Sequence, residues 1–511
     1  MIERKISRPK IYNDWGHTKY TRACAIAILG IAVAYVLKLP SGGSSLSYDS
    51  FRYLAGADSI VASGTYLDIS GAPQSHWPPG TSIVYAVAAY LSHRPPEELV
   101  KFINLAALLL MAGSLWTIIE ITIERWWIAI ISFASIFLNT AILSLQNKLW
   151  SDPLALGTST AAMASAIIAC RGDKNWFRWM CVASIFLSIA ICIRFAMLPG
   201  IPILAAVAFG LSKKSESHRE AIIVPFLSPL LTLISFYVLR SSTAYSHTLS
   251  FRSFNSIVAT VSSPDFFMQF WPSLVPLADQ VFPVALLATG LSVIVVIIGL
   301  IVAPASVAFM RPQQRDALLI CIGYVLLSFI FLLTVPAIST FSIEMEFRYL
   351  LPIYPFIVLG SAIAADFLLN QQKLYAPILG LFVIGLLSIA AARSSRAAAV
   401  QLWSESYSSD SCPSRMALLN DLRRISIPQS PAAVLTNSQG LAWYAMRVAA
   451  VPLTRTALKD APIGTIVIFA RPGNTCADIV EAKDFSEIAL AHTSDVGIIF
   501  STDRILIGRK Q

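Results

Sequence analysis

The sequence predicts a mainly α-helical, polytopic membrane protein with about 11 transmembrane helices, followed by a small C-terminal α/β domain. Of the 511 residues, 56% are hydrophobic and only 13% are charged, whereas a soluble protein carries about 25% charged residues. The mean hydropathy is +0.67. Long apolar segments recur as far as Ala392, and beyond it the composition becomes mixed and rich in short β-type runs.

Eleven apolar segments are long enough, or nearly so, to cross a bilayer, because a helix needs roughly 17–25 residues to span the hydrocarbon core. They cover residues 23–37, 102–119, 126–145, 153–170, 179–193, 195–212, 221–239, 281–303, 317–335, 349–365 and 374–392. A further apolar stretch, GTSIVYAVAAYL at 80–91, is short and is followed by HRPP. A run of this length is typical of an interfacial or re-entrant helix, so we do not count it as a span.

The basic residues predict the orientation of these spans. The net charge is +9, but the lysines and arginines lie mostly in short loops and not on one soluble surface, which argues against nucleic acid as a partner. Placing the N-terminus inside concentrates them in the inner loops, as the positive-inside rule requires, whereas counting 80–91 as a span would abolish this bias. We therefore predict a cytoplasmic N-terminus acting as a signal anchor, an outer C-terminus, and a long first outer loop at 38–101 that carries surface helices.

Residues 393–511 are predicted to form a small extracytoplasmic α/β domain. The β-rich runs AAVLTNS, VAAVPL, GTIVIFA, VGIIFS and RILIGR alternate with helix-like stretches such as RMALLNDLRRI. Five of the seven cysteines lie in or beside apolar segments, and the other two, Cys412 and Cys476, lie in this domain. In an oxidising compartment such a pair predicts one disulfide, with two unrelated thiols as the alternative.

The residues that could carry chemistry are polar groups that the topology places at the outer face. They are Asp49, Arg52, His76, Lys148, Asp152, Arg194, Arg348 and Tyr349. Ionisable groups near a bilayer are costly and usually mark a pathway or a site. The sequence contains no Walker loop, dinucleotide fingerprint, HExxH or paired CxxC, so we expect no cofactor, although a divalent metal stays open.

Four motifs, in order along the chain, resemble those of a known family. YDSFRYL, WPPG, WSDPLAL and RYLLPIYP are similar to motifs of the integral-membrane glycosyltransferases of the GT-C fold, above all the branch of protein mannosyltransferases and aminoarabinose transferases. The resemblance extends from residue 20 to residue 460 or so. It implies a GT-C-like transmembrane domain at 1–392, a polyprenyl-phosphate sugar as donor, and reaction at the extracytoplasmic face. Family members often have D-E-x-x-Y or D-x-x-x-Y in the first outer loop, and here Ser50 follows Asp49, so a second carboxylate is missing.

The resemblance also implies roles for individual residues. Transfer to a hydroxyl needs a base for the acceptor proton and positive charge for the departing phosphate. Asp49 is the expected base, and Asp152 is expected to orient the acceptor or to share that task. The candidates for binding the donor phosphate or the substrate are Arg52, His76, Lys148, Arg194, Arg348 and Tyr349. The family implies inversion at the anomeric carbon.

A structural alternative exists for most of these residues. Asp49 has the place of an N-cap of a surface helix, and Asp152 precedes Pro153 in a pattern typical of a helix start. For Arg194 the alternative is an interfacial anchor, for Arg348 an ion pair with Glu344 or Glu346, and for His76 an ordinary loop residue.

Two other functional classes compete with the enzyme. A transporter or flippase of lipid-linked sugars would carry charges in the middle of its spans and broken helices in pseudo-symmetric halves. Here the spans are nearly free of charge at their centres, which favours an enzyme. The other class is an inactive scaffold with the same fold. The expected partners are a polyprenyl-phosphate sugar, membrane lipid and an envelope acceptor, which is a glycolipid, a polysaccharide or a protein. The expected location is a bacterial inner membrane.

Overall fold

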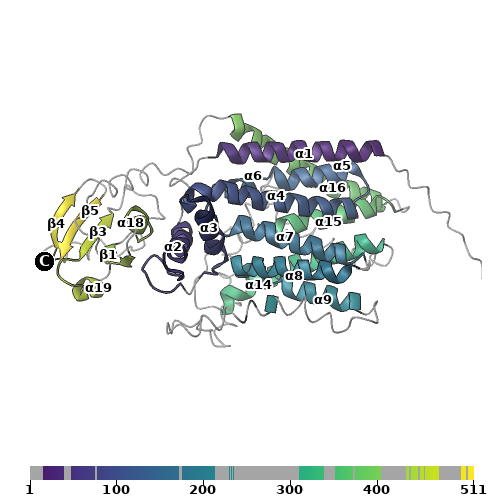
Figure 1. Ribbon diagram of the computed structural model, residues 1–511. Coiled ribbons are helices and arrows are strands. Elements are labelled where there is room, and N and C mark those ends of the chain that lie inside the picture. The colour runs from purple at the N-terminus through teal and green to yellow at the C-terminus, as the bar shows by residue number, and fades with distance from the viewer. Residues whose placement is uncertain are drawn as a thin grey trace, which may run out of the picture.

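The computed structural model describes most of the helical part of the chain and the strands of the C-terminal part. The described residues are 15–39, 48–74, 77–171, 175–212, 229, 230, 232, 234, 310–338, 351–371, 375–403, 433–436, 439–446, 449–453, 455–470, 496–501 and 505–510. Figure 1 shows a bundle of helices that run side by side, with a β-sheet beyond one end of the bundle. Two shorter helices of the first loop lie between the bundle and the sheet.

The bundle consists of helices that match most of the predicted apolar segments. They are α1 (Trp15–Lys38), α4 (Pro96–Thr122), α5 (Trp126–Phe137), α6 (Thr140–Ser144), α7 (Asp152–Ala169), α8 (Trp176–Ile193), α9 (Gly200–Ser212), α14 (Pro312–Ile338), α15 (Tyr354–Leu368) and α16 (Tyr375–Trp403), with the 3-10 turns η2 (Leu145–Asn147) and η3 (Phe195–Met197). Six helices of the described residues are long and apolar enough to cross a membrane. The predicted spans 221–239 and 281–303 lie almost entirely outside the described residues, so the total of eleven stays a prediction.

The centre of the bundle is α7. Every residue of this helix except Ile168 is buried. Small residues allow neighbouring helices to approach closely, and a Cβ atom at Gly157 would lie 2.6 Å from the carbonyl oxygen of Ala107 on α4. The buried hydroxyls of Thr158, Thr160 and Ser165 donate to carbonyls one turn earlier in α7. This packing fixes the N-terminus of α7, where Asp152 is the first residue.

One predicted span differs from the structure. Residues 126–145 were expected to form one helix, but α5 ends at Phe137 and α6 begins at Thr140. The cause is Asn139, whose Oδ1 accepts hydrogen bonds from the backbone N–H groups of Ala141 at 2.9 Å and Ile142 at 3.3 Å. This is an N-cap, and it starts a new helix that leads the chain to Lys148.

The segment predicted to be the first outer loop contains α2 (Tyr48–Ser63) and α3 (Gly80–Ser92). Figure 1 shows both helices lying across the end of the bundle rather than along it. Helix α3 covers the apolar stretch that was too short for a span, and it has 13 residues. The hydroxyl of Ser82 on α3 donates to the carbonyl of Tyr53 on α2 at 2.9 Å, so the two helices are joined directly.

The C-terminal strands form one mixed sheet. The strands are β1 (Ala433–Thr436), β2 (Ala449–Pro452), β3 (Ile466–Ala470), β4 (Val496–Ser501) and β5 (Ile505–Lys510), in the order β2-β1-β3-β5-β4. Strand β1 is parallel to β2 and β3, and β5 is antiparallel to β3 and β4. The helices α18 (Gln439–Met446) and α19 (Arg455–Asp460) complete the described part. The strands coincide with the five β-rich runs of the sequence, whereas α16 continues past the predicted boundary at residue 392 to Trp403.

Candidate functional site

Polar side chains from α2, α7 and the end of α8 meet around Tyr53. Asp49 lies in the first turn of α2 and is half-buried, and Tyr53 follows it by four residues, which places both on one face of the helix. Tyr53 is buried. Its hydroxyl is hydrogen-bonded to the side chain of Ser151, and it lies within electrostatic reach of Asp49, Arg194 and Asp152. The structure therefore brings together three residues that the sequence had placed only on the same side of the membrane.

The electrostatics of this group keep the Tyr53 hydroxyl neutral. Burial, and after it the negative charge of Asp49, raise the pKa of Tyr53 far above its ordinary value. The hydrogen bond with Ser151 and the positive charge of Arg194 oppose the shift without overcoming it. A tyrosine that stays protonated can donate a hydrogen bond but cannot act as a base. Among these groups, the base must therefore be a carboxylate.

A buried ion pair forms the second part of the site. Arg194 Nη1 lies 2.5 Å from Asp152 Oδ1 and donates a hydrogen bond to Ser151 Oγ at 3.3 Å. The Asp152 side chain is fully buried, and that of Arg194 is 11% exposed. Neither carboxylate oxygen of Asp152 accepts a hydrogen bond of good geometry. Because a buried carboxylate is costly without such bonds, the charge of Arg194 is its main compensation.

Helix ends explain why these two charges lie here. Asp152 is in the first turn of α7, and Arg194 follows the last residue of α8 in an extended conformation. A carboxylate is favoured at a helix N-terminus and a guanidinium at a C-terminus. The two helices pack side by side in opposite directions, so the N-terminal end of one lies beside the C-terminal end of the other.

The WPPG motif packs against Tyr53 and the end of α8. The Tyr66 hydroxyl donates to the carbonyls of Trp77 at 3.2 Å and Pro78 at 3.3 Å. The Trp77 ring lies edge-on to Tyr53, with 5.8 Å between the ring centroids. At Gly80 a Cβ atom would lie 2.6 Å from the carbonyl oxygen of Cys192. The glycine therefore allows the start of α3 to contact the backbone at the end of α8, two residues before Arg194.

We expect Gly80→Ala to displace this junction. The new methyl group meets backbone atoms of Cys192 and Ile193, which cannot rotate away, so the end of α8 must move and carry Arg194 with it. Overpacking of this kind typically costs about 1–3 kcal/mol. Thermal unfolding of the purified protein will show a lower midpoint. The matched control is Gly113→Ala on α4, where a Cβ atom meets nothing within 4 Å, and a midpoint for Gly80→Ala equal to that of the control would contradict the close contact.

The backbone of Lys148 is held in place by a hydrogen bond from Asn104. Asn104 on α4 is buried, and its Nδ2 donates to the carbonyls of Gln146 at 3.1 Å and Lys148 at 2.9 Å. The Lys148 ammonium lies 4.6 Å from the centroid of the Trp150 ring, a cation–π distance. Lys148 is half-buried, as is Arg52 one turn after Asp49. Both remain candidates for binding a phosphate.

Several predicted residues lie outside the described part of the chain. These are His76, Arg348, Tyr349 and the two cysteines Cys412 and Cys476. Their expected roles in substrate binding and in a disulfide stay predictions. Within the described ranges, no group of three or more histidine, cysteine, aspartate or glutamate side chains could hold a metal ion.

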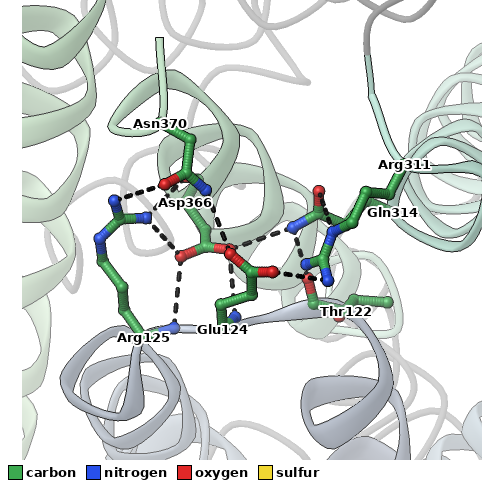
Figure 2. A network of polar contacts seen from close by, with 7 residues as sticks. All are labelled: Thr122, Glu124, Arg125, Arg311, Gln314, Asp366 and Asn370. Atoms are coloured by element: carbon green, nitrogen blue, oxygen red, sulfur yellow. Dashed lines mark hydrogen bonds and ion pairs between the residues drawn. The ribbon is translucent and has the colours of Figure 1, made fainter. Parts of the chain in front are cut away.

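A second polar cluster lies where α4 ends and α14 begins. Figure 2 shows Asp366 of α15 at its centre, fully buried. Its carboxylate accepts from Arg125 Nη1 at 2.9 Å, from Gln314 Nε2 at 3.0 Å and from the backbone N–H of Glu124 at 3.1 Å. Asn370 accepts from Arg125 at 2.8 Å, and an exposed pair joins Arg311 and Glu124.

The two clusters differ in how completely their acceptors are satisfied. Donors surround the carboxylate of Asp366, and they come from the α4–α5 connection and α14, so this cluster ties four helices together. Asp152 has an ion pair but no well-formed hydrogen bond, and Asp49 is half-buried. A buried charge whose hydrogen bonding is incomplete is costly to keep, and such charges usually mark a functional site. The group around Tyr53 is therefore the candidate active site, and the Asp366 cluster is structural.

Solved structures identify the fold. No family model and no curated protein matches the sequence. ArnT from Cupriavidus metallidurans, bound to undecaprenyl phosphate, superposes with a TM-score of 0.57 at 12% identity, over 97% of this chain and 98% of that chain. The archaeal oligosaccharyltransferase AglB from Archaeoglobus fulgidus, in complex with an inhibitory peptide and a dolichol-phosphate, gives a TM-score of 0.53 at 12% identity, over 89% and 70% of the two chains. Both are GT-C fold membrane glycosyltransferases.

The chain has the GT-C fold. This confirms the fold that the four motifs predicted. At 12% identity the superposition establishes the GT-C fold and not the reaction. The reaction has to be argued from the residues around Tyr53.

Proposed function

We propose that this GT-C protein is a glycosyltransferase that moves a sugar from a polyprenyl-phosphate donor to an envelope acceptor, with inversion at the anomeric carbon. The observation that carries the proposal is the meeting of Asp49, Tyr53 and the Asp152–Arg194 pair at one end of the bundle. The ArnT structure holds undecaprenyl phosphate and the AglB structure a dolichol-phosphate, which supports this donor class.

Asp49 is the proposed base. It is half-buried at the start of a surface helix, where an acceptor hydroxyl arriving from water can reach it. As the acceptor oxygen bonds to the anomeric carbon, Asp49 takes the hydroxyl proton, and the bond between that carbon and the phosphate oxygen breaks. The electron pair leaves with the polyprenyl phosphate. Positioned bases contribute about 10²–10⁴-fold to such steps.

Arg194 is the proposed group that stabilises the leaving phosphate. A guanidinium suits phosphate oxygens, and electrostatic stabilisation is largest when the donor groups are fixed beforehand. Asp152 and Ser151 fix Arg194. Because Asp152 is fully buried, we assign to it the orientation of Arg194 in preference to direct contact with the acceptor. The further binding candidates are Arg52, Lys148, Arg348, and also His76 and Tyr349.

The assay that tests this proposal uses the purified protein and a panel of polyprenyl-phosphate sugars, with release of polyprenyl phosphate as the readout. Transfer to an added glycolipid, polysaccharide or protein acceptor supports the proposal. Movement of the lipid-linked sugar across a liposome without cleavage of its phosphate–sugar bond would instead identify a flippase.

The proposed reaction face also predicts a topology. Lysines and arginines are concentrated in the predicted inner loops. In a bacterial inner membrane, a reporter fused after Gln511 is therefore expected on the periplasmic side, and a reporter inserted between Lys213 and His218 on the cytoplasmic side. Alkaline phosphatase and fluorescent-protein fusions measure this directly. Reporters on the same side would contradict the eleven-span topology.

A further inference from the structure

The helix that carries Asp49 is packed on two sides. On one side α3 contacts it through Ser82, and on the other side it contacts α18 of the C-terminal sheet region. Figure 1 shows α2 between α18 and α3. The rings of Phe51 and Tyr444 lie 5.6 Å apart between their centroids, and both side chains are only 4% exposed. Phe51 is two residues from Asp49, so the contact lies next to the candidate base.

A second contact joins the first loop to the edge of the sheet. The backbone N–H of Ala450 in β2 donates to the carbonyl of Ile69 at 2.8 Å, and Ile69 is 1% exposed. Ile69 is held in a tight turn, because Asp68 accepts hydrogen bonds from Ser70 and Ala72. Strand β2 is at the edge of the sheet, and an unpaired edge otherwise presents open backbone donors and acceptors.

Backbone N–H groups along β2 point alternately toward β1 and away from the sheet, and the N–H of Ala450 points away. The N–H of Leu453 donates inward, to the carbonyl of Thr436 at the end of β1. Residues of the opposite parity, Ala450 and Pro452, therefore direct their N–H positions away from the sheet. Pro452, which has no backbone N–H, occupies one of these outward-facing positions, so the sheet itself needs no donor on this side of β2. The bond from Ala450 is thus an interface contact and not part of the sheet's own pairing.

We propose that the corner formed by α18 and β2 positions α2, and that Tyr444 and Ala450 thereby set the place of Asp49 in the transfer reaction. This inference rests on the proposed function. Tyr444 contacts the ring of Phe51, and it acts through Phe51 and the helix. A misplacement of the base by about 1 Å is enough to cost on the order of 10²-fold in rate. Binding of the donor depends on other groups, such as Arg194, which are fixed by α7 and α8.

The test compares Tyr444→Ala and Ala450→Pro with the wild type in the full-length protein. We expect kcat to fall by about 10- to 100-fold, with KM for the polyprenyl-phosphate sugar changed by less than about threefold, and faster hydrogen exchange at the amides of α2. Tyr444→Phe keeps the ring and is expected to retain most of the wild-type kcat and the slow hydrogen exchange in α2. Ile498→Ala is the matched control, since Ile498 is a 60% exposed side chain of the same sheet and should change neither quantity.

The exchange readout separates this inference from the proposed function. If the wild type transfers no sugar, the proposed function fails, while slow exchange in α2 that Tyr444→Ala accelerates still supports positioning of the helix. Full kcat in Tyr444→Ala overturns the inference. The inference is also overturned if the activity of Tyr444→Ala falls only in proportion to the amount of folded protein and hydrogen exchange in α2 is unchanged.

Discussion

The Asp49→Asn variant is expected to transfer sugar about 10²- to 10⁴-fold more slowly than the wild type while folding normally. An amide has nearly the size of a carboxylate, but it cannot take the proton of an acceptor hydroxyl. Asp49 is half-buried in the first turn of α2, where an amide still supports the helix start. The measurement is kcat with a saturating polyprenyl-phosphate sugar, normalised to monodisperse protein.

A second carboxylate of the same helix provides the control. Asp58 lies nine residues further along α2 and is also half-buried, so Asp58→Asn changes the charge of the helix without touching the Tyr53 group. We expect it to keep kcat within about threefold, because Asp58 is not among the groups that act on Tyr53. Full activity in Asp49→Asn would leave Asp49 as a helix-start residue only, and the base would have to be sought elsewhere.

Much of the site around Tyr53 could be predicted because its residues lie in recognisable motifs that the predicted topology places on one side of the membrane. Asp49, Asp152 and Arg194 were all singled out from the sequence, and they meet around Tyr53. Tyr53 itself had no assigned role, although it is the tyrosine of the D-x-x-x-Y pattern that begins at Asp49. Ser151, next to Asp152, was also missed. A spacing of four residues on a helix was the available signal for Tyr53.

The direct pairing of Asp152 with Arg194 could not be predicted. It depends on α7 and α8 packing side by side in opposite directions, and a sequence shows the ends of helices but not their neighbours. The same limit applies to the contact between Ile69 and Ala450, which joins parts of the chain far apart in sequence. Asp366 was overlooked for a simpler reason, because the predicted apolar segment ended at residue 365 while α15 continues to Leu368.

The sequence predicted the apolar part of each helix but not the polar residues that begin or extend it. Helix α4 begins at Pro96, six residues before its apolar segment, because Glu97 and Glu98 are favourable in a first turn. Helix α7 has polar residues throughout and is still buried, since its hydroxyls bond to its own backbone. The break at Asn139 inside an apolar segment was signalled only by one capping residue.

The Asp366→Asn variant is expected to show the opposite behaviour to Asp49→Asn: reduced stability and unchanged chemistry. An amide places an NH₂ group among the donors from Arg125, Gln314 and the Glu124 backbone, and it removes the charge that neutralises Arg125. Breaking a buried pair costs roughly 3–5 kcal/mol, and the lower end applies here because the Arg125 side chain is 26% exposed. The measurement is the thermal midpoint of the purified protein.

A matched variant within the same network is Glu124→Gln. Its ion pair with Arg311 is about half exposed on both sides, at 49% and 47%, and exposed pairs of this kind contribute about 0–1 kcal/mol. Glu124→Gln should therefore leave the midpoint nearly unchanged. The Asp366 cluster contacts Thr122, the last residue of α4, whereas the first half of α7, which begins at Asp152, packs against α4 at Ala107. Because the two sites are separated along α4, the folded fraction of Asp366→Asn should keep the wild-type kcat. A stable Asp366→Asn protein that has lost its kcat would reverse the assignment and make the Asp366 cluster a functional site.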